Sequence, residues 1–281
     1  MLTGALLLDP EKNIAAKDYI KKYVLRILLA IVIFGIPFSI LKMIMETKKI
    51  SISFIPLSVK AIIENDSLSH MWYLYTLIGL YIVLPILRSF VKYASDKEVL
   101  LVLISFFIID FVFPLINGLV NCKIAFDLPL KYPVFYVLMG WELKRNSKSI
   151  SDKINEKRCI VFVFGIIGVI WILNFTLPSM DYLVGYNSPL IVILSMAIFF
   201  FFKIRFCNAG IKKEVSIWKV DRLCFGVYLI HPVFIQFTYR FLKVTPIYRN
   251  FFPLFTIACF GAFTVLSFIA SWMISRIPLL R

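Results

Sequence analysis

The stretch VLRILLAIVIFGIPFSILKMI, residues 24–44, decides the class of protein to which this chain belongs. Its charged residues are Arg26 near the start and Lys42 near the end, and a bilayer-crossing helix needs about 20 mainly apolar residues. The whole chain shares this character, because 60% of its 281 residues are hydrophobic, 17% are charged and the mean hydropathy is +0.88. Soluble domains carry about 25% charged residues. The chain is therefore an integral membrane protein.

Seven more apolar stretches of spanning length follow the first one. We predict an all-α, polytopic integral membrane helix bundle of about eight transmembrane helices, forming one domain over residues 1–281. Met1–Leu8 is too short to span and has no basic segment before it, so it resembles the end of a helix rather than a signal peptide. The longest loop, about residues 45–70, is mixed in charge. The predicted spans are 24–44, 71–90, 99–120, 128–143, 159–180, 182–202, 223–242 and 250–275.

The distribution of basic residues predicts the orientation. Of the 31 Lys and Arg residues, 22 fall in the segments at the two termini and after every second span, and 9 fall in the other segments. Basic residues are enriched on the cytoplasmic side, so we expect both termini in the cytoplasm. The net charge of +15 lies between apolar runs rather than on a soluble face, which excludes nucleic acid as a partner.

Few residues in this chain could carry chemistry. The five cysteines are scattered without metal-ligand spacing, so we expect no metal site and no disulfides. None of the GxSxG, GxxxxGK[ST], GxGxxG or HExxH signatures of soluble enzymes occurs. The chain has two histidines, His70 and His231. Any chemistry has to be organised by the helix bundle itself.

Four polar residues at or near membrane depth are candidates for function, because intramembrane charges are costly. Asp110 lies midway along the third span, where it could mark a pathway or pair with a Lys or Arg of a neighbouring helix. Arg26 could act in a site or as a snorkelling interface anchor. His231 precedes Pro232 and could satisfy carbonyls that the proline frees. His70, at the outer entrance of the second span, could be a solvated cap.

An aromatic cluster opens the second span. Trp72 and Tyr73 fit an interfacial belt, where Trp and Tyr concentrate. Tyr75 is deeper and shares a helix face with Trp72, and Gly79 continues that face one turn later. These residues could therefore line a groove that holds a ligand or a neighbouring helix. The residues alone do not choose between an enzyme and a transporter.

Four stretches together resemble the acyltransferase 3 family, multi-pass bacterial membrane enzymes that move acyl groups onto sugars of surface polysaccharides and related acceptors. HMWYLYTLIGLYIVLPILRSFV at 70–91 is similar to the family's H-x-W-[FY]-L-x-x-L-x-G-L-Y block, and CFGVYLIHPVFI at 224–235 is similar to its SFGIYLIHP block. The opening residues 1–28 and the close ISRIPLLR at 274–281 also fit. The resemblance covers the whole chain.

The resemblance implies O-acetylation or a related modification of a cell-surface glycan in the bacterial inner membrane. The donor would be acetyl-CoA or another acyl-CoA, the acceptor a glycan or lipid-linked saccharide, and no cofactor or metal would be bound. Where the family has a basic R-x-x-R motif for the donor, this chain has Tyr23-Val24-Leu25-Arg26, so only Arg26 matches it. The residues that we expect in the site are Lys21, Lys22 and Arg26 for the donor phosphates, His231 and Tyr228 as catalytic candidates, and His70, Trp72, Tyr73, Tyr75 and Asp110 as lining residues.

The family fold has about ten spans, and its first helix carries the His and Arg regarded as its catalytic hallmark. We expect that helix to be missing from this chain, either because the true start lies upstream of Met1 or because the gene is shortened. The first explanation is favoured, since a half helix leaves apolar faces uncovered. Two other functions stay open: a catalytically inactive, truncated family member, and a transporter for a glycan or organic anion that uses Asp110 and Arg26 as pathway charges.

Overall fold

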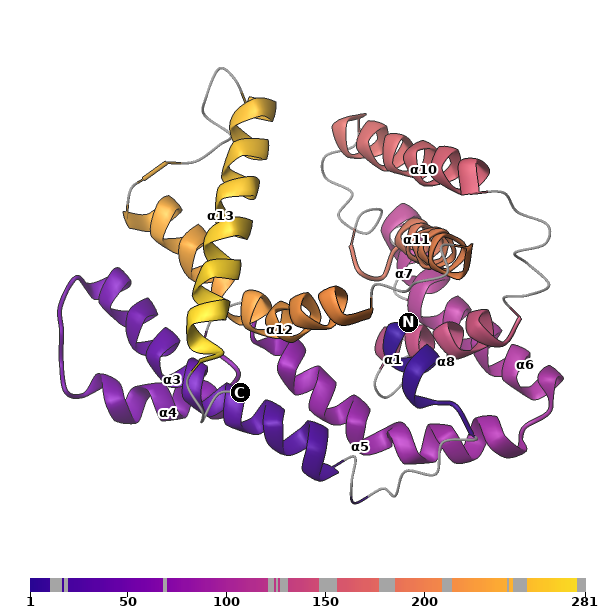
Figure 1. The fold of residues 1–281 in the computed structure, drawn as a ribbon, viewed down its shortest axis with the longest axis horizontal. Helices are drawn as coiled ribbons and strands as arrows, with labels where there is room; N and C mark the ends of the chain where they lie inside the picture. The colour runs from indigo at the N-terminus through magenta and orange to yellow at the C-terminus, as the bar shows by residue number, and fades with distance from the viewer. Residues whose placement is uncertain are drawn as a thin grey trace. The chain divides into compact units, whose positions relative to one another are not determined.

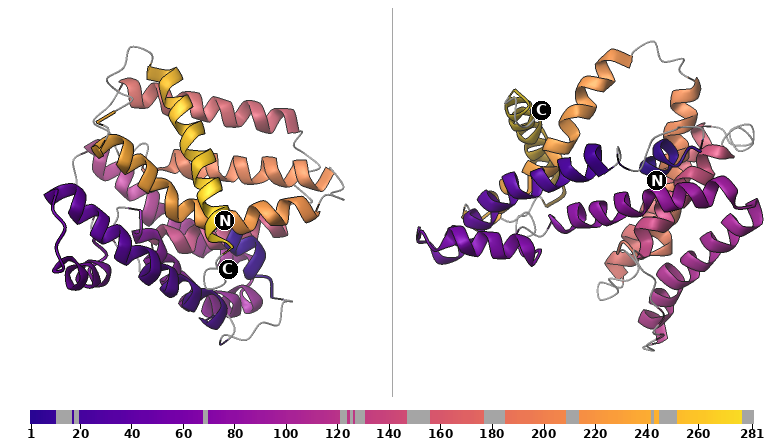
Figure 2. Two further views of the ribbon diagram at one scale, coloured as in Figure 1. Left: turned by 60° about the vertical axis from the view of Figure 1, so that its left-hand side comes forward. Right: turned by 90° about the horizontal axis from the view of Figure 1, so that it is seen from below.

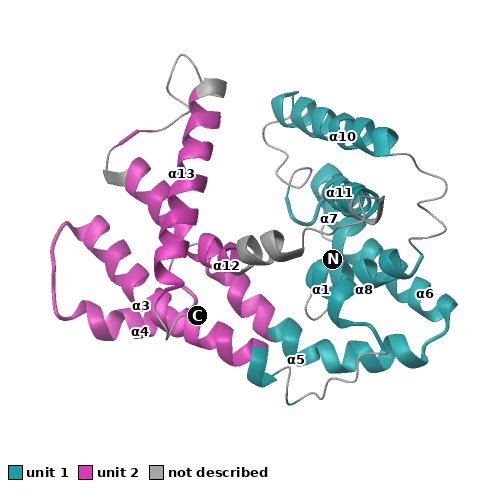
Figure 3. Ribbon diagram, viewed as in Figure 1, with its two compact units in different colours: residues 1–22, 79–211 teal, residues 23–78, 212–281 magenta. Residues whose placement is uncertain are grey.

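The computed structural model describes residues 1–10, 17, 20–67, 70–120, 124, 126, 131–146, 156–176, 185–208, 214–241, 243–244 and 252–276. The chain divides into two compact units, coloured separately in Figure 3. Unit 1 comprises residues 1–22 and 79–211, and unit 2 comprises residues 23–78 and 212–281. In the described residues all regular structure is helical (Figure 1), which confirms the predicted all-α class.

Each of the eight predicted spans coincides with a helix. In the part of the chain that the structure describes, five helices are long and apolar enough to cross a membrane by length and composition: Ile20–Thr47, Trp72–Tyr93, Asp96–Val120, Glu156–Thr176 and Phe255–Ile274. Residues 177–184, where the fifth predicted span ends and the sixth begins, lie outside the described residues. One helix was not predicted: α4 (Phe54–Ile63) occupies part of the expected loop 45–70. At ten residues it is about 15 Å long, too short to span.

Unit 1 is built around helix α8 (Lys131–Arg145). Its inner face buries Val134, Phe135, Val137 and Leu138, and the rings of Phe111 and Phe135 lie 4.9 Å apart. Short helix α1 (Leu2–Leu7) packs directly on it, since a Cβ added at Gly4 would overlap the Val137 carbonyl. The other helices of the unit are most of α5 (Trp72–Tyr93), α6 (Asp96–Phe107), the π-helical turn η2 (Ile108–Val112), α7 (Phe113–Val120), α10 (Glu156–Thr176) and α11 (Pro189–Asn208).

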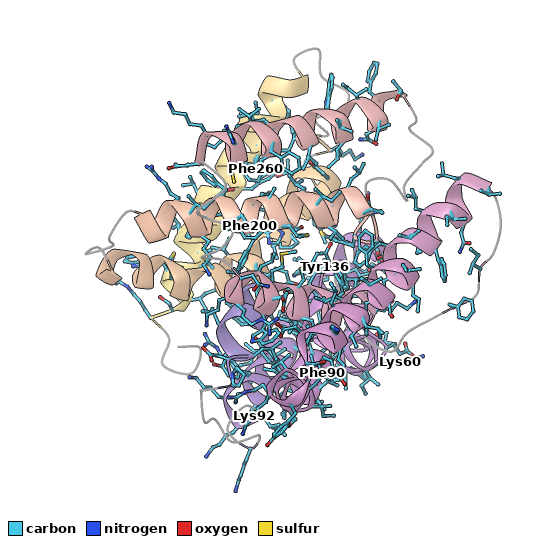
Figure 4. All side chains as sticks on the ribbon, turned by 90° about the vertical axis from the view of Figure 1, so that its right-hand side faces the viewer. Lys60, Phe90, Lys92, Tyr136, Phe200 and Phe260 are labelled. Atoms are coloured by element: carbon cyan, nitrogen blue, oxygen red, sulfur yellow. The ribbon has the colours of Figure 1, made fainter. Side chains whose placement is uncertain are left out.

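Helices α10 and α11 lie side by side within unit 1 (Figures 1 and 2). Most side chains of α10 are exposed, and they are apolar on every face of the helix. Figure 4 shows such side chains projecting from the helices; one that it labels, Phe260 on α13 of unit 2, is 72% exposed. An apolar surface all around a helix is typical of contact with lipid.

Ion pairs and hydrogen bonds at one end of unit 1 connect four segments. The distribution of Lys and Arg predicts that these four segments lie on the same side of the membrane. Lys144 pairs with Asp9 at 3.0 Å, and Arg88 donates to the Asp9 carbonyl at 3.0 Å. Arg145 pairs with Asp96 at 2.7 Å. Lys203 donates to the Lys144 carbonyl at 3.1 Å. These contacts join segments 1–26, 88–98, 144–158 and 203–222, and so support the predicted alternation of sides.

Unit 2 contains two helix pairs. In the first, α3 (Leu25–Thr47) packs against α4, and Gly35 allows this approach, because a Cβ there would lie 3.1 Å from Ile62. In the second, α12 (Glu214–Gln236) packs against α13 (Phe252–Ile274). The unit also includes the first turns of α5 and two π-helical turns, η4 (Phe237–Phe241) and part of η1 (Ile20–Val24).

The contact between α12 and α13 is made by small residues. The Ser271 hydroxyl donates to the Leu223 carbonyl at 2.8 Å, and Ser271 is 4% exposed. A Cβ at Gly226 would overlap this hydroxyl and lie 3.1 Å from Ser271 Cβ. Small residues let membrane helices approach closely and exchange interhelical hydrogen bonds.

Replacing Gly226 by leucine should therefore destabilise unit 2. The new side chain has to displace Ser271, which breaks the Ser271–Leu223 hydrogen bond and overpacks the contact, at a cost of about 1–3 kcal/mol. The measurement is the midpoint temperature for loss of the monodisperse peak in detergent. Gly261→Leu on α13 is the matched control, since nothing lies within 4 Å of its Cβ position. Equal midpoints for the two variants would contradict the close contact.

Candidate functional site

The region around Pro232 of α12 fixes the orientation of the His231 ring. Proline has no N–H, so Pro232 leaves the carbonyl of Tyr228 without its helical donor. One of the two interpretations of His231 was that it satisfies a carbonyl freed in this way. The ring instead bonds through Nδ1 to the Val227 carbonyl at 3.1 Å, one residue earlier. Because a carbonyl only accepts, Nδ1 carries the hydrogen, and in the neutral ring Nε2 keeps its lone pair.

Four rings from two parts of the chain gather beside this histidine in unit 2. The His70 ring centroid lies 5.9 Å from that of His231 and 5.5 Å from that of Tyr228. The Tyr228 centroid lies 6.1 Å from His231 and 5.7 Å from Tyr73. We call these residues, His70, Tyr73, Tyr228 and His231, the His–Tyr cluster. The structure thus brings both candidate catalytic residues together with two predicted lining residues.

The backbone that carries His70 is held from both sides. The Tyr228 hydroxyl donates to the His70 carbonyl at 2.5 Å, across 158 positions of sequence. On the other side, the Tyr75 hydroxyl donates to the Ile62 carbonyl at 2.5 Å and so ties α5 to α4. Lys42 of α3 pairs with Asp66 at 2.8 Å. These bonds tie α4 and Asp66 to α5 and α3, and the Tyr228 bond ties His70 to α12.

The His70 ring is surrounded mainly by other rings. Phe38 of α3 adds a fifth ring, 6.2 Å from His70 by centroids. Among the described residues, neither ring nitrogen of His70 has a hydrogen-bond partner of good geometry. His70 is therefore not a solvated cap, because its ring lies among other side-chain rings.

These surroundings keep the His70 imidazole neutral. Burial, aided by the charge of nearby His231, lowers the pKa of His70 from 6.5 to about 4, and the Leu229 backbone acts weakly in the opposite direction. In the unfolded chain His70 would take up a proton at higher pH. With respect to this group, the folded state is therefore most stable above about pH 6.5, and it loses stability as the pH falls toward 4.

Arg26, which lies in the opening stretch that resembles the family, contacts α12. Its guanidinium carbon lies 5.6 Å from the centroid of Phe225, within the range of a cation–π contact. Arg26 is exposed, as are Lys21 and Lys22 on the π-helical turn just before it. Phe225 lies one helical turn before Tyr228, so the three motif blocks at 23–28, 70–75 and 224–231 meet in unit 2.

Two other predicted site residues, Asp110 and Trp72, are not members of the His–Tyr cluster. Asp110 belongs to unit 1, where it is 6% exposed on the π-helical turn η2, a rare backbone form that often marks functional positions. Trp72 packs edge-on against Tyr73 at 6.0 Å. In the described part of the chain, no group of three or more His, Cys, Asp or Glu residues could hold a metal ion.

Sequence reasoning missed two aromatic side chains at the site, Phe38 and Phe225. Phe225 could have been found, because it precedes Tyr228 by three residues and so shares its helix face. Phe38 carries no local signal, since it is one of 28 phenylalanines in apolar runs.

Comparison with known families agrees with these observations. A family model described as an acyltransferase domain matches residues 1–275. No curated protein and no solved structure matches the chain. The match extends over both units and includes the three motif blocks that meet in unit 2. The chain is a multi-pass membrane protein and belongs to the acyltransferase 3 family.

Proposed function

We propose that this protein is a membrane O-acyltransferase that moves an acyl group, acetyl in the simplest case, from acyl-CoA to a hydroxyl of a cell-surface glycan or its lipid-linked precursor. It would lie in the bacterial cytoplasmic membrane with both termini inside. Membership of the acyltransferase 3 family supports the reaction class. The observation that carries the proposal in this chain is the orientation of His231 within the His–Tyr cluster.

The reaction needs a base at the acceptor hydroxyl. The hydroxyl oxygen attacks the thioester carbonyl, its proton passes to the base, the carbon–sulfur bond breaks, and the thiolate leaves and takes up a proton. His231 suits the role of base, because its Nδ1–H is engaged by Val227 and the lone pair of Nε2 is directed elsewhere. Tyr228 donates its hydrogen to the His70 carbonyl, so it supports the cluster rather than the reacting atoms.

The donor carries phosphates, which cationic side chains bind. Arg26 is the residue that matches the family's basic motif, and its guanidinium carbon lies 5.6 Å from the ring of Phe225, which is one helical turn before Tyr228 of the His–Tyr cluster. Lys21 and Lys22 add exposed positive charge on the preceding turn. We assign the binding of the donor phosphates to these three residues. The acceptor would bind on the side of the His–Tyr cluster where Tyr73 is 43% exposed.

Replacing His231 by asparagine tests whether this residue acts as the catalytic base or only as a packing group. The amide nitrogen of the new side chain would occupy the position of Nδ1 and keep the bond to Val227, whereas the basic Nε2 would be lost. We expect CoA release from acetyl-CoA to fall about 100-fold or more, within the range for loss of a general base. The measurement uses membranes that contain the protein, without any ion gradient.

The control for that variant is its detergent midpoint temperature, which should equal that of the wild type. Activity close to the wild-type level would show that His231 is only a packing group. Gradient-driven uptake of a glycan or organic anion without any release of CoA would favour the transporter instead.

Replacing Arg26 by glutamine should weaken donor binding. Loss of one charge-assisted contact costs about 1.5–3 kcal/mol, so KM for acetyl-CoA should rise at least about tenfold while kcat changes little. Arg276→Gln is the matched control, because Arg276 also lies over a ring, that of Trp272 at 3.8 Å, in the same unit. If both variants raise KM equally, Arg26 has no specific part in binding the donor.

A further inference from the structure

We propose that Tyr228 is a positioning residue, which holds His70 beside His231 so that the two imidazoles act as one site for a single proton. This inference deepens the proposed function and rests on it for its catalytic meaning. The pairing itself can be tested without any acyl transfer.

Tyr228 is the residue that connects the members of the His–Tyr cluster. Its ring contacts those of His70, Tyr73 and His231, at centroid distances of 5.5, 5.7 and 6.1 Å. Its hydroxyl bonds to the carbonyl of His70 itself. His70 comes just before the first turn of α5, and this bond joins it directly to α12. Without the hydroxyl, the carbonyl keeps the bond from the Tyr73 N–H at 3.4 Å but loses its link to α12, so the ring is free to turn away from α12.

The groups that face His70 make a second positive charge unfavourable. α12 contributes Tyr228 and His231, and α3 contributes uncharged Phe38. The Leu229 backbone of α12 acts in the opposite direction, but burial and His231 outweigh it. The Lys42–Asp66 ion pair on the α3 side carries no net charge. No carboxylate contact with the His70 ring occurs among the described residues. Two imidazolium rings 5.9 Å apart in this environment would repel each other.

The consequence for catalysis concerns the proton that His231 removes from the acceptor. When His231 is charged, the ring beside it is a neutral imidazole whose nitrogens have no other good partner in the described residues. Such a ring can accept an N–H from a charged neighbour. His70 would therefore stabilise the imidazolium of His231 until the proton passes to the departing thiolate.

The test follows the two histidines by nuclear magnetic resonance. With ¹³C-labelled histidine the chain gives two signals, because it has two histidines, and His70→Gln assigns them. In the wild type in detergent, the His70 signal should keep its neutral position down to about pH 5, with a midpoint near 4. In Tyr228→Phe the His70 midpoint should move upward by at least about one pH unit, a tenfold gain in proton affinity.

Tyr73→Phe is the matched control, since it removes a hydroxyl from the same cluster without touching the bond to the His70 carbonyl. The His70 midpoint should stay where it is in that variant. A wild-type midpoint near 6.5, or an unmoved midpoint in a folded Tyr228→Phe protein, would overturn the proposal. If Tyr228→Phe fails to fold, His231→Asn takes its place: loss of the neighbouring charge should raise the His70 midpoint, and no change would overturn the pairing.

An activity measurement ties the pair to the reaction. In Tyr228→Phe the His70 ring takes up its proton at higher pH, so CoA release should fall more steeply with decreasing pH between about 7 and 5 than in the wild type. An unchanged slope, with the resonance shifts as expected, would overturn the catalytic part of the proposal. Absence of CoA release from the wild type would instead remove the proposed function, and the resonance result would still decide the pairing.

Discussion

The constraint on which this structure depends is that polar groups at membrane depth have to find their partners inside the protein. The chain meets it with hydroxyl-to-carbonyl hydrogen bonds between segments. Ser271 donates to Leu223, Tyr75 to Ile62 and Tyr228 to His70. Each bond satisfies the hydroxyl that donates it and joins two elements of unit 2. The same bonds that remove an energetic penalty therefore also determine which residues become neighbours.

The His–Tyr cluster follows from this constraint. Its two imidazoles come from segments far apart in the sequence, and a tyrosine that serves as a structural donor lies between them. His231 is oriented by its own helix through Val227, whereas His70 is oriented by α12 through Tyr228. One ring therefore depends on local helical geometry and the other on tertiary contacts. A disturbance of unit 2 would displace His70 before it displaced His231.

Much of the fold could be predicted from the sequence, because spanning helices leave a long apolar signal. The eight predicted spans coincide with helices, although α4 was taken for loop, since its ten residues lie among charged ones. The site was predicted only in part. Polarity at or near membrane depth selected His70 and His231, and the motif block at 224–235 added Tyr228, but no periodicity links position 70 to position 231. Their contact depends on how α12 packs, and for the same reason Phe38 gave no signal.

Most side chains of helix α10 are exposed, so its sequence shows what a lipid environment requires of a helix. It is apolar on all sides, and most of its side chains lie open, including those of Phe164, Trp171 and Phe175. Gly165 and Gly168 have open space where a side chain would stand. Lipid tails fit any apolar shape, so this surface sets no requirement for a particular side chain. Exchange among Leu, Ile, Val and Phe should leave the helix intact, which makes α10 the place where the sequence can drift most freely.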